Sequence, residues 1–135
     1  MSFKNVIQVP NVPKPRGVWS NTIVTSPGQM VFISGMLARA ADGALMGVGD
    51  IEIQTRQTCE NLKSAIEAAG GTLANIVRVD VYITDMRHFD AIHAVRRIYF
   101  PVDPPVSTMV QVIGFTLPGA MIEMNAIAVL PQGIT

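Results

Sequence analysis

Apolar and polar positions follow a helical period between residues 50 and 69. The positions that share one side recur at steps of three and four, namely Thr55, Cys59, Leu62, Ile66 and Ala69. Charged residues take the opposite side, and this pattern predicts an amphipathic helix. Asp50 is placed to cap its N-terminus, and Gly70-Gly71 is placed to end it.

A two-residue period predicts the strands. Val77, Val79, Val81 and Ile83 alternate with polar residues, as in a strand with one buried face. Further β-branched or apolar runs predict strands near Phe3–Val9, Asn21–Thr25, Met30–Ser34, Ser107–Ile113 and Met121–Val129. The turn residues Ser26-Pro27-Gly28-Gln29 predict a hairpin between the second and third of these runs.

A second helix is expected from Arg87 to Tyr99, where Phe89, Ile92 and Val95 share a stripe. Before residue 20, closely spaced prolines predict an extended arm. The order of elements is strands, long helix, strand, helix and strands. This order predicts an α+β fold, with residues 1–135 as a single domain and two helices packed on one face of one sheet.

Charged residues are scarce. The 135 residues include ten basic and ten acidic side chains, which is 15% of the chain against a usual value of about 25%. Either the core is unusually large, or other copies of the chain cover part of the surface. We favour an oligomer, because the predicted layout leaves one sheet face without helices.

Several classes of protein are excluded by the same composition. Net charge is zero and no basic cluster exceeds Arg96-Arg97, so nucleic-acid binding is not expected. A single cysteine allows no disulfide within the chain, and the first residues lack the apolar core of a secretory signal. No apolar stretch is long enough to span a membrane. We therefore expect a soluble, cytoplasmic protein.

Common cofactor, metal and nucleophile motifs are incomplete. Gly47-Val48-Gly49 lacks the third glycine of a dinucleotide-binding loop. His88 and His93 are five residues apart, so they share a helix face poorly and indicate surface or subunit-contact histidines rather than a metal site. Cys59 lies on the apolar stripe, where a buried thiol is expected. We expect no metal and no cofactor.

Glu123 and two loop arginines are the candidates for chemistry. Glu123 interrupts an otherwise apolar strand, so it is either paired or solvated, or it lies in a cleft where a carboxylate can deprotonate water. Arg16 and Arg39 lie on predicted loops, where they are either solvated or able to bind an anion. The residue types alone leave these alternatives open.

Four segments in order along the chain resemble the Rid (YjgF-like) family of enamine/imine deaminases. They are 31–35 (VFISG), 54–70 (QTRQTCENLK to AAG), 76–89 (strand, then Asp-Met and Phe) and 122–128 (IEMNAIA). The resemblance implies a chorismate-mutase-like fold and a homotrimer with ligand clefts between subunits. It also implies hydrolysis of small enamines or imines to a keto compound and ammonia, without metal or cofactor.

The resemblance also assigns roles to individual residues. Glu123 matches the glutamate that positions the attacking water. Trp19 stands in place of a tyrosine that lines the cleft, His93 stands where asparagine is common, and Thr108 matches a cleft position. Main-chain groups near Thr108 and Gly35 are expected to orient the ligand.

One position departs from the family pattern. Deaminating members carry an arginine that grips the substrate carboxylate, whereas this chain has Val106, which can neither carry charge nor donate a hydrogen bond. Hydrolysis of ordinary 2-imino acids is therefore not expected. The alternative function is a non-catalytic ligand-binding or regulatory trimer.

Two short motifs resemble the 2-aminomuconate deaminase branch of aromatic catabolism. They are residues 14–17 (KPRG) and 34–39 (SGMLAR), the second followed by Asp42-Gly43. On this reading Arg16 or Arg39 supplies the anion contact that Val106 cannot make.

Overall fold

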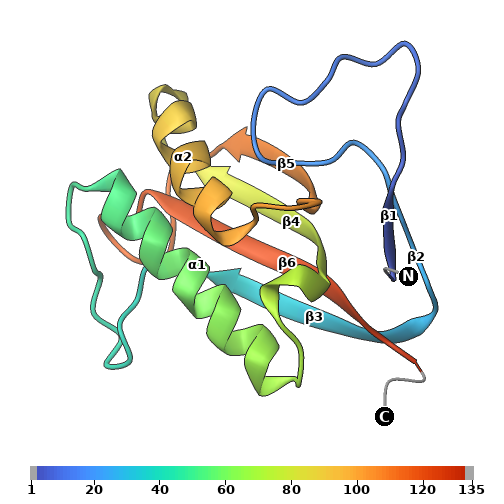
Figure 1. The fold of residues 1–135 in the computed structure, drawn as a ribbon. Coiled ribbons are helices and arrows are strands. Elements are labelled where there is room, and N and C mark those ends of the chain that lie inside the picture. The colour runs from blue at the N-terminus through green and yellow to red at the C-terminus, as the bar shows by residue number, and fades with distance from the viewer. Residues whose placement is uncertain (1–2, 133–135) are drawn as a thin grey trace.

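The computed structural model describes residues 3–132 of the chain (Figure 1). Its longer elements alternate between strands and two helices, with short 3-10 turns before β4 and α2. In chain order they are β1 (Lys4–Val6), β2 (Ile23–Thr25), β3 (Gly28–Met36), α1 (Ile51–Ala68), a 3-10 turn (Leu73–Asn75), β4 (Ile76–Ile83), a second 3-10 turn (Met86–His88), α2 (Phe89–Tyr99), β5 (Val106–Gln111) and β6 (Ile122–Pro131).

Four strands form a mixed sheet in the order β3-β6-β4-β5. Only β4 and β5 run parallel to each other, and the other two pairs are antiparallel. Both helices lie on the same face of this sheet, while β1 and β2 form a separate ribbon beside it (Figure 1). The predicted α+β architecture is confirmed, with a mixed sheet and two helices on one face.

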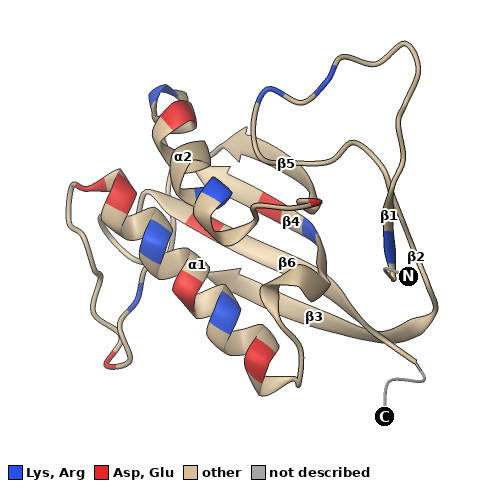
Figure 2. Ribbon diagram, in the orientation of Figure 1, with Lys and Arg blue, Asp and Glu red and all other residues tan. Residues whose placement is uncertain are grey.

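The helix α1 begins and ends where its capping residues predict. The Asp50 side chain accepts a hydrogen bond from the backbone N–H of Ile53 at 3.0 Å. After the last turn, Gly70 adopts a φ of +91°, in the left-handed region that favours glycine. Charged residues of both signs are spread along α1 (Figure 2), whereas Cys59 and Leu62 of the same helix are fully buried in the core.

The core lies between the helices and the sheet. Alternate residues of β6, and of β4 from Val79 to Ile83, point into it and are shielded from solvent, as the two-residue period predicts. At the start of β4 a shift in register buries Ile76, whereas Val77, which was predicted to be buried, is only half-buried. The fully buried residues of these strands and of the facing helices are Ile76, Val79, Val81, Ile83, Ile122, Met124, Ala128, Cys59, Leu62, Ile66 and Ile92.

The predicted hairpin between β2 and β3 is wrong. The strand β2 pairs with β1, and β3 pairs with β6 along almost its whole length. A three-residue β2 offers β3 few backbone partners, whereas pairing with β6 places Ile33 in the core. The turn at residues 26–27 therefore connects two different sheets.

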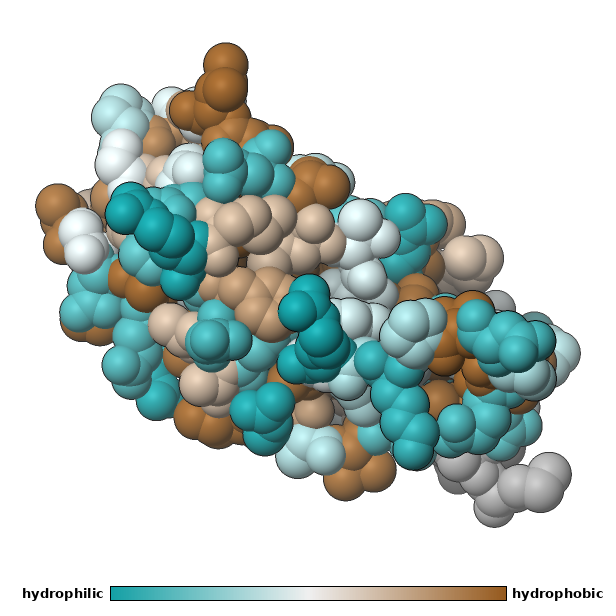
Figure 3. All heavy atoms as spheres, turned by 90° about the horizontal axis from the view of Figure 1, so that it is seen from above, coloured by the Kyte–Doolittle hydropathy of each residue, from teal (hydrophilic) through white to brown (hydrophobic). Residues whose placement is uncertain are grey.

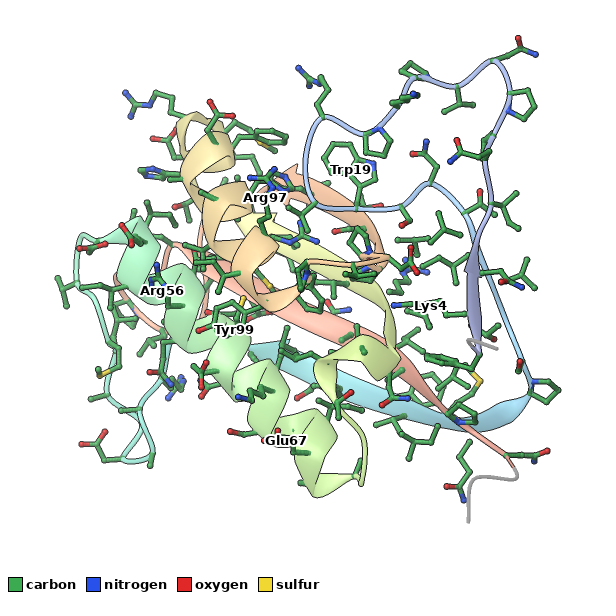
Figure 4. All side chains as sticks on the ribbon, in the orientation of Figure 1. Lys4, Trp19, Arg56, Glu67, Arg97 and Tyr99 are labelled. Atoms are coloured by element: carbon green, nitrogen blue, oxygen red, sulfur yellow. The ribbon has the colours of Figure 1, made fainter. Side chains whose placement is uncertain are left out.

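The arm at residues 7–22 is fastened to β5 and α2. Ser20 donates from its backbone N–H to Pro105 O at 3.0 Å and from its hydroxyl to Pro104 O at 2.6 Å. Val18 donates its backbone N–H to His93 Nδ1 at 2.9 Å. Trp19 lies inside the curve of the arm (Figure 4), with its ring 5.4 Å from that of His93.

His93 and Arg96 are buried, which corrects the expectation for the histidine. The histidine was expected at the surface or at a subunit contact, but only 3% of it is exposed, because the arm covers this side of α2. Arg96, the first residue of the Arg96-Arg97 pair, is completely buried, a position that the sequence pattern did not indicate. Only Arg97 remains exposed.

Within residues 3–132, neither helix combines the length and the apolar character needed to cross a bilayer.

Acid is expected to loosen the arm through His93. Burial, with smaller contributions from Arg96 and Arg97, lowers the pKa of His93 from 6.5 to about 4. Between these values the unfolded chain binds a proton that the folded chain excludes, so stability is complete above pH 6.5 and falls as the pH drops toward 4. One such proton gives a slope of at most about 1.4 kcal/mol per pH unit.

Urea unfolding between pH 7 and pH 4.5 measures this slope. We expect His93→Gln to flatten it, since glutamine does not titrate and can still accept the Val18 N–H. His88→Gln, which removes the other histidine, is the control. Equal slopes in wild type and His93→Gln would show that His93 is not the source.

Candidate active site

The sheet has an open face that carries no helix. Side chains alternate between the two faces of each strand, so the partners of the core residues point away from the helices. Aligned by strand register, the residues of this open face are Phe32, Arg78, Asp80, Tyr82, Val106, Thr108, Val110, Glu123, Asn125 and Ile127. Three of the predicted site residues, Val106, Thr108 and Glu123, therefore share one face.

Glu123 folds back over Gly35 of the neighbouring strand. A Cβ atom built on Gly35 would meet the Glu123 carboxyl group, with the carboxyl carbon 2.7 Å away. Any side chain at position 35 would therefore displace the glutamate. The carboxylate is half-buried, and no described residue forms a hydrogen bond or an ion pair with it. It borders a wide hollow of about 640 Å³ formed with residues 113–116.

A buried glutamine holds the loop that leads to Glu123. Gln54 of α1 donates from Nε2 to Gly47 O and to Gly119 O, both at 3.1 Å. Its Oε1 accepts the backbone N–H of Met121 at 2.8 Å. These three bonds satisfy the buried amide and fasten two loops to the start of α1. One of the bonded groups, Met121 N–H, is only two residues before Glu123. The sequence pattern did not single out Gln54, because polar residues at a helix start are usually exposed.

A second group of site residues lies along β5. Val106 and Thr108 border a hollow of about 330 Å³ together with Trp19 and Ser20 of the arm. Its floor is polar, because Asp80 accepts hydrogen bonds from Arg78 Nε at 3.1 Å and from Asn125 Nδ2 at 3.2 Å. Seen from above, hydrophilic and hydrophobic residues are interspersed over the surface of the molecule (Figure 3).

A third group lies between the arm and α2. The rings of Trp19, Phe89 and His93 pack together, and the Arg16 guanidinium lies 5.8 Å from the centre of the Phe89 ring. A cavity of about 200 Å³ opens beside these rings and reaches Arg96. Neither Arg96 nor Ser107, its hydrogen-bond partner at 3.0 Å, was among the predicted site residues.

Arg39 lies apart from these three groups. Its Nη1 is 3.5 Å from Gly43 O in its own loop, and its backbone carbonyl accepts a hydrogen bond from Asn61. Neither Arg39 nor Arg16 lines the hollow at Val106. Among the described residues of one chain, Arg78 is the only arginine that borders the hollow at Val106, and it forms an ion pair with Asp80.

The distance between Thr108 and Glu123 matters for any joint role. Thr108 pairs with Asp80 and Glu123 pairs with Tyr82, so the two lie two strand spacings and two residues apart. Sheet geometry then separates their Cα atoms by about 12 Å. Within a single chain the carboxylate and the β5 residues border different hollows.

Other reactive groups are structural where the chain is described. Burial raises the pKa of the Cys59 thiol to about 12, so it is protonated at neutral pH and is not a nucleophile. Among residues 3–132, no group of three or more histidine, cysteine, aspartate or glutamate side chains could hold a metal ion.

Comparison with known proteins places the chain in a family. The family described as Endoribonuclease L-PSP matches residues 9–130. The RutC family protein PH0854 of Pyrococcus horikoshii is 38% identical over 127 residues, which cover 93% of this chain and 98% of that protein. A second RutC family protein, PYRAB12510 of Pyrococcus abyssi, is 35% identical and covers 93% and 96%.

Solved structures show the same fold. The Rid family protein YyfB from Yersinia pestis, of unknown function, superposes with a TM-score of 0.87 at 30% identity, covering 95% of this chain and 99% of that one. RidA from Psychrobacter sp. PAMC 21119 gives a TM-score of 0.71 at 28% identity, covering 93% and 99%. The chorismate-mutase-like fold expected from the resemblance is confirmed, and the chain belongs to the Endoribonuclease L-PSP family, which comprises the Rid and RutC proteins.

Proposed function

We propose that the protein hydrolyses a small enamine or imine, with Glu123 activating the attacking water. The observation that carries this proposal is the half-buried carboxylate, which has no hydrogen-bond or ion-pair partner among residues 3–132 and is held over Gly35 beside an open hollow. A carboxylate in that position can accept a proton from water. Family membership supports the same reaction class.

The reaction needs only one base and good positioning. An enamine tautomerises to its imine, whose carbon is electrophilic. Glu123 takes a proton from water as the oxygen attacks that carbon and passes it to the nitrogen, which forms a neutral carbinolamine. The hydroxyl proton then moves to the nitrogen as the C–N bond breaks, and a keto compound and ammonia are released. No external oxidant or reductant takes part, so the proposal includes no cofactor.

We propose that the working form is a homotrimer in which the open sheet faces meet. Phe32 is 70% exposed on this face, a large apolar ring left in water by the isolated chain. Thr108 and Glu123 border different hollows within one chain. In a cleft between subunits, Glu123 of one copy would lie beside the β5 residues of the next copy. Trp19, His93, Val106 and Thr108 are proposed to bind substrate on the β5 side of that cleft.

The residue at position 106, where deaminating members have an arginine that binds the substrate carboxylate, determines which substrates the site accepts. With Val106 in place of an arginine, we propose a substrate other than a simple 2-imino acid. An aminomuconate-like intermediate of aromatic catabolism remains the specific candidate, with Arg16 or Arg39 of one subunit reaching the cleft.

An RNA substrate is not favoured, although the family description names an endoribonuclease. RNA binding needs a surface rich in unpaired cations. This chain has no net charge, and three of its arginines, Arg56, Arg78 and Arg87, form ion pairs with neighbouring acids.

Removing the base is expected to stop hydrolysis. Glu123→Gln keeps the size of the side chain but cannot accept the proton, so kcat should fall about 10²- to 10⁴-fold. The measurement is ammonia release from 2-aminomuconate and from a panel of imines generated in the assay. Glu60→Gln, the same change on the exposed side of α1, is the control and should keep wild-type kcat. Equal rates in wild type and Glu123→Gln contradict the mechanism.

Restoring the clamp is expected to change substrate preference. Val106→Arg adds a charge-assisted contact, which contributes about 1.5–3 kcal/mol. That energy corresponds to a gain of about 10- to 100-fold in kcat/KM for 2-iminopropanoate over a neutral imine. Val106→Met controls for the larger side chain. A similar gain in both variants would rule out the charge as its cause.

The trimer can be tested at the open face. Sedimentation should give a particle of three times the 14.5 kDa chain mass. Phe32→Glu, which places a charge among packed sheet faces, should shift it to the monomer. Val102→Glu, at a loop position that is 75% exposed, is the matched control and should leave the mass unchanged. A wild-type monomer would refute the assembly.

A further inference from the structure

Arg96 is a buried cation without a counterion. It lies on α2, is completely buried, and forms no ion pair with any carboxylate of residues 3–132. Its Nη2 donates to Ser107 Oγ at 3.0 Å, but Nε and Nη1 have no hydrogen-bond partner in the described part of the chain. Burial lowers its pKa to about 10, which still leaves it charged at neutral pH. An unpaired buried charge is strongly unfavourable, so this arrangement calls for an anion.

The guanidinium lines a cavity that can hold one. The cavity encloses about 200 Å³ between the arm, α2 and β5, and its walls are Trp19, Phe89, His93, Arg96, Ser107 and Met109. Trp19 and Phe89 are half-buried and mark the side nearer the surface, while Arg96 and His93 lie at the buried end. The cavity therefore has a polar floor and an apolar entrance.

His93 adds a donor to the same floor. Its Nδ1 accepts the Val18 N–H, so in the neutral ring the proton is on Nε2. That Nε2 is buried and, like the two guanidinium nitrogens, has no hydrogen-bond partner among the residues that the structure describes. The low pKa of this histidine keeps the ring neutral at pH 7, so it donates a hydrogen bond without adding a second charge.

These donors fit a monocarboxylate. A carboxylate presents two oxygens that accept several hydrogen bonds and carries the single negative charge that neutralises one guanidinium. Water could occupy some of the hydrogen bonds but would leave the charge unpaired. The volume corresponds to about six or seven water molecules at ~30 Å³ each, which limits the ligand to a small one.

We propose that this cavity binds a small monocarboxylate whose flat or branched apolar body lies against Trp19, Phe89 and Met109. The cavity shares Trp19 and His93 with the proposed substrate-binding residues, and Trp19 and Ser107 also border the hollow at Val106, so what is new is the carboxylate contact at Arg96. Ser107 points toward the helices, whereas Val106 and Thr108 on either side of it point to the open face. Glu123 does not line this cavity, so binding of a carboxylate at Arg96 can be measured apart from hydrolysis.

The only tryptophan of the chain reports on the cavity directly. Phenylacetate, titrated into the wild-type protein, should change the Trp19 fluorescence saturably and raise Tm. Phenylacetamide has the same shape without the charge, and we expect at least tenfold weaker binding. This comparison needs no variant. Equal binding of the acid and the amide would overturn the proposal.

Variants locate the binding site. Arg96→Met should weaken phenylacetate binding at least tenfold while leaving Tm equal or higher, because replacing an unpaired buried ion by an apolar chain of similar length removes an unfavourable burial. Arg97→Met, the exposed neighbour on α2 (Figure 4), is the matched control and should bind as wild type. Glu123→Gln, which removes only the proposed base, should also bind as wild type, so that a failure of hydrolysis and a failure of carboxylate binding can be told apart.

Two results with these variants would contradict the proposal. Unchanged phenylacetate binding in Arg96→Met would show that the guanidinium does not hold the carboxylate. A large loss of stability in Arg96→Met, with no effect of phenylacetate on wild type, would show that Arg96 serves the fold alone.

Discussion

Side chains alternate between the two faces of a strand, and in β6 this alternation decides both the core and the candidate active site. Ile122 and Met124 lie beneath the helices, while Glu123 and Asn125 lie on the open face. Because β6 is bonded to strands on both sides, a slip of one residue would put the carboxylate into the core and apolar groups into water. Packing of the core therefore keeps Glu123 on the open face, because any other register of β6 would be much less stable.

Two buried polar side chains show opposite solutions to the same constraint. Gln54 uses its whole amide, donating to two carbonyls and accepting from Met121, so it stabilises the loops around α1 as a closed network. Arg96 carries a full charge, and among the described residues its guanidinium forms a hydrogen bond only with Ser107. The first arrangement is complete within the chain, whereas the second is complete only with an additional anion.

Local signals made the helices predictable, and long-range contacts limited the rest. The period of α1, its cap at Asp50 and its end at Gly70 all lie within a few turns, so its boundaries were predicted closely. Pairing of β2 with β1 depends on residues about twenty positions away, and the turn signal at Pro27 could not reveal it. Burial of His93 depends on the arm folding back, and no residue pattern within α2 shows that. Glu123 could be found because a lone carboxylate in an apolar strand is itself a local signal.

The contact between Gly35 and Glu123 makes these two positions a joint marker. A folded-back glutamate on β6 is compatible only with glycine at the facing position, so the pair is informative where either residue alone is ambiguous. A homologous sequence with a glutamate at 123 but a larger residue at 35 must aim that carboxylate elsewhere. Covariation at this pair would thus separate chains that keep the same carboxylate orientation from those that share only the fold.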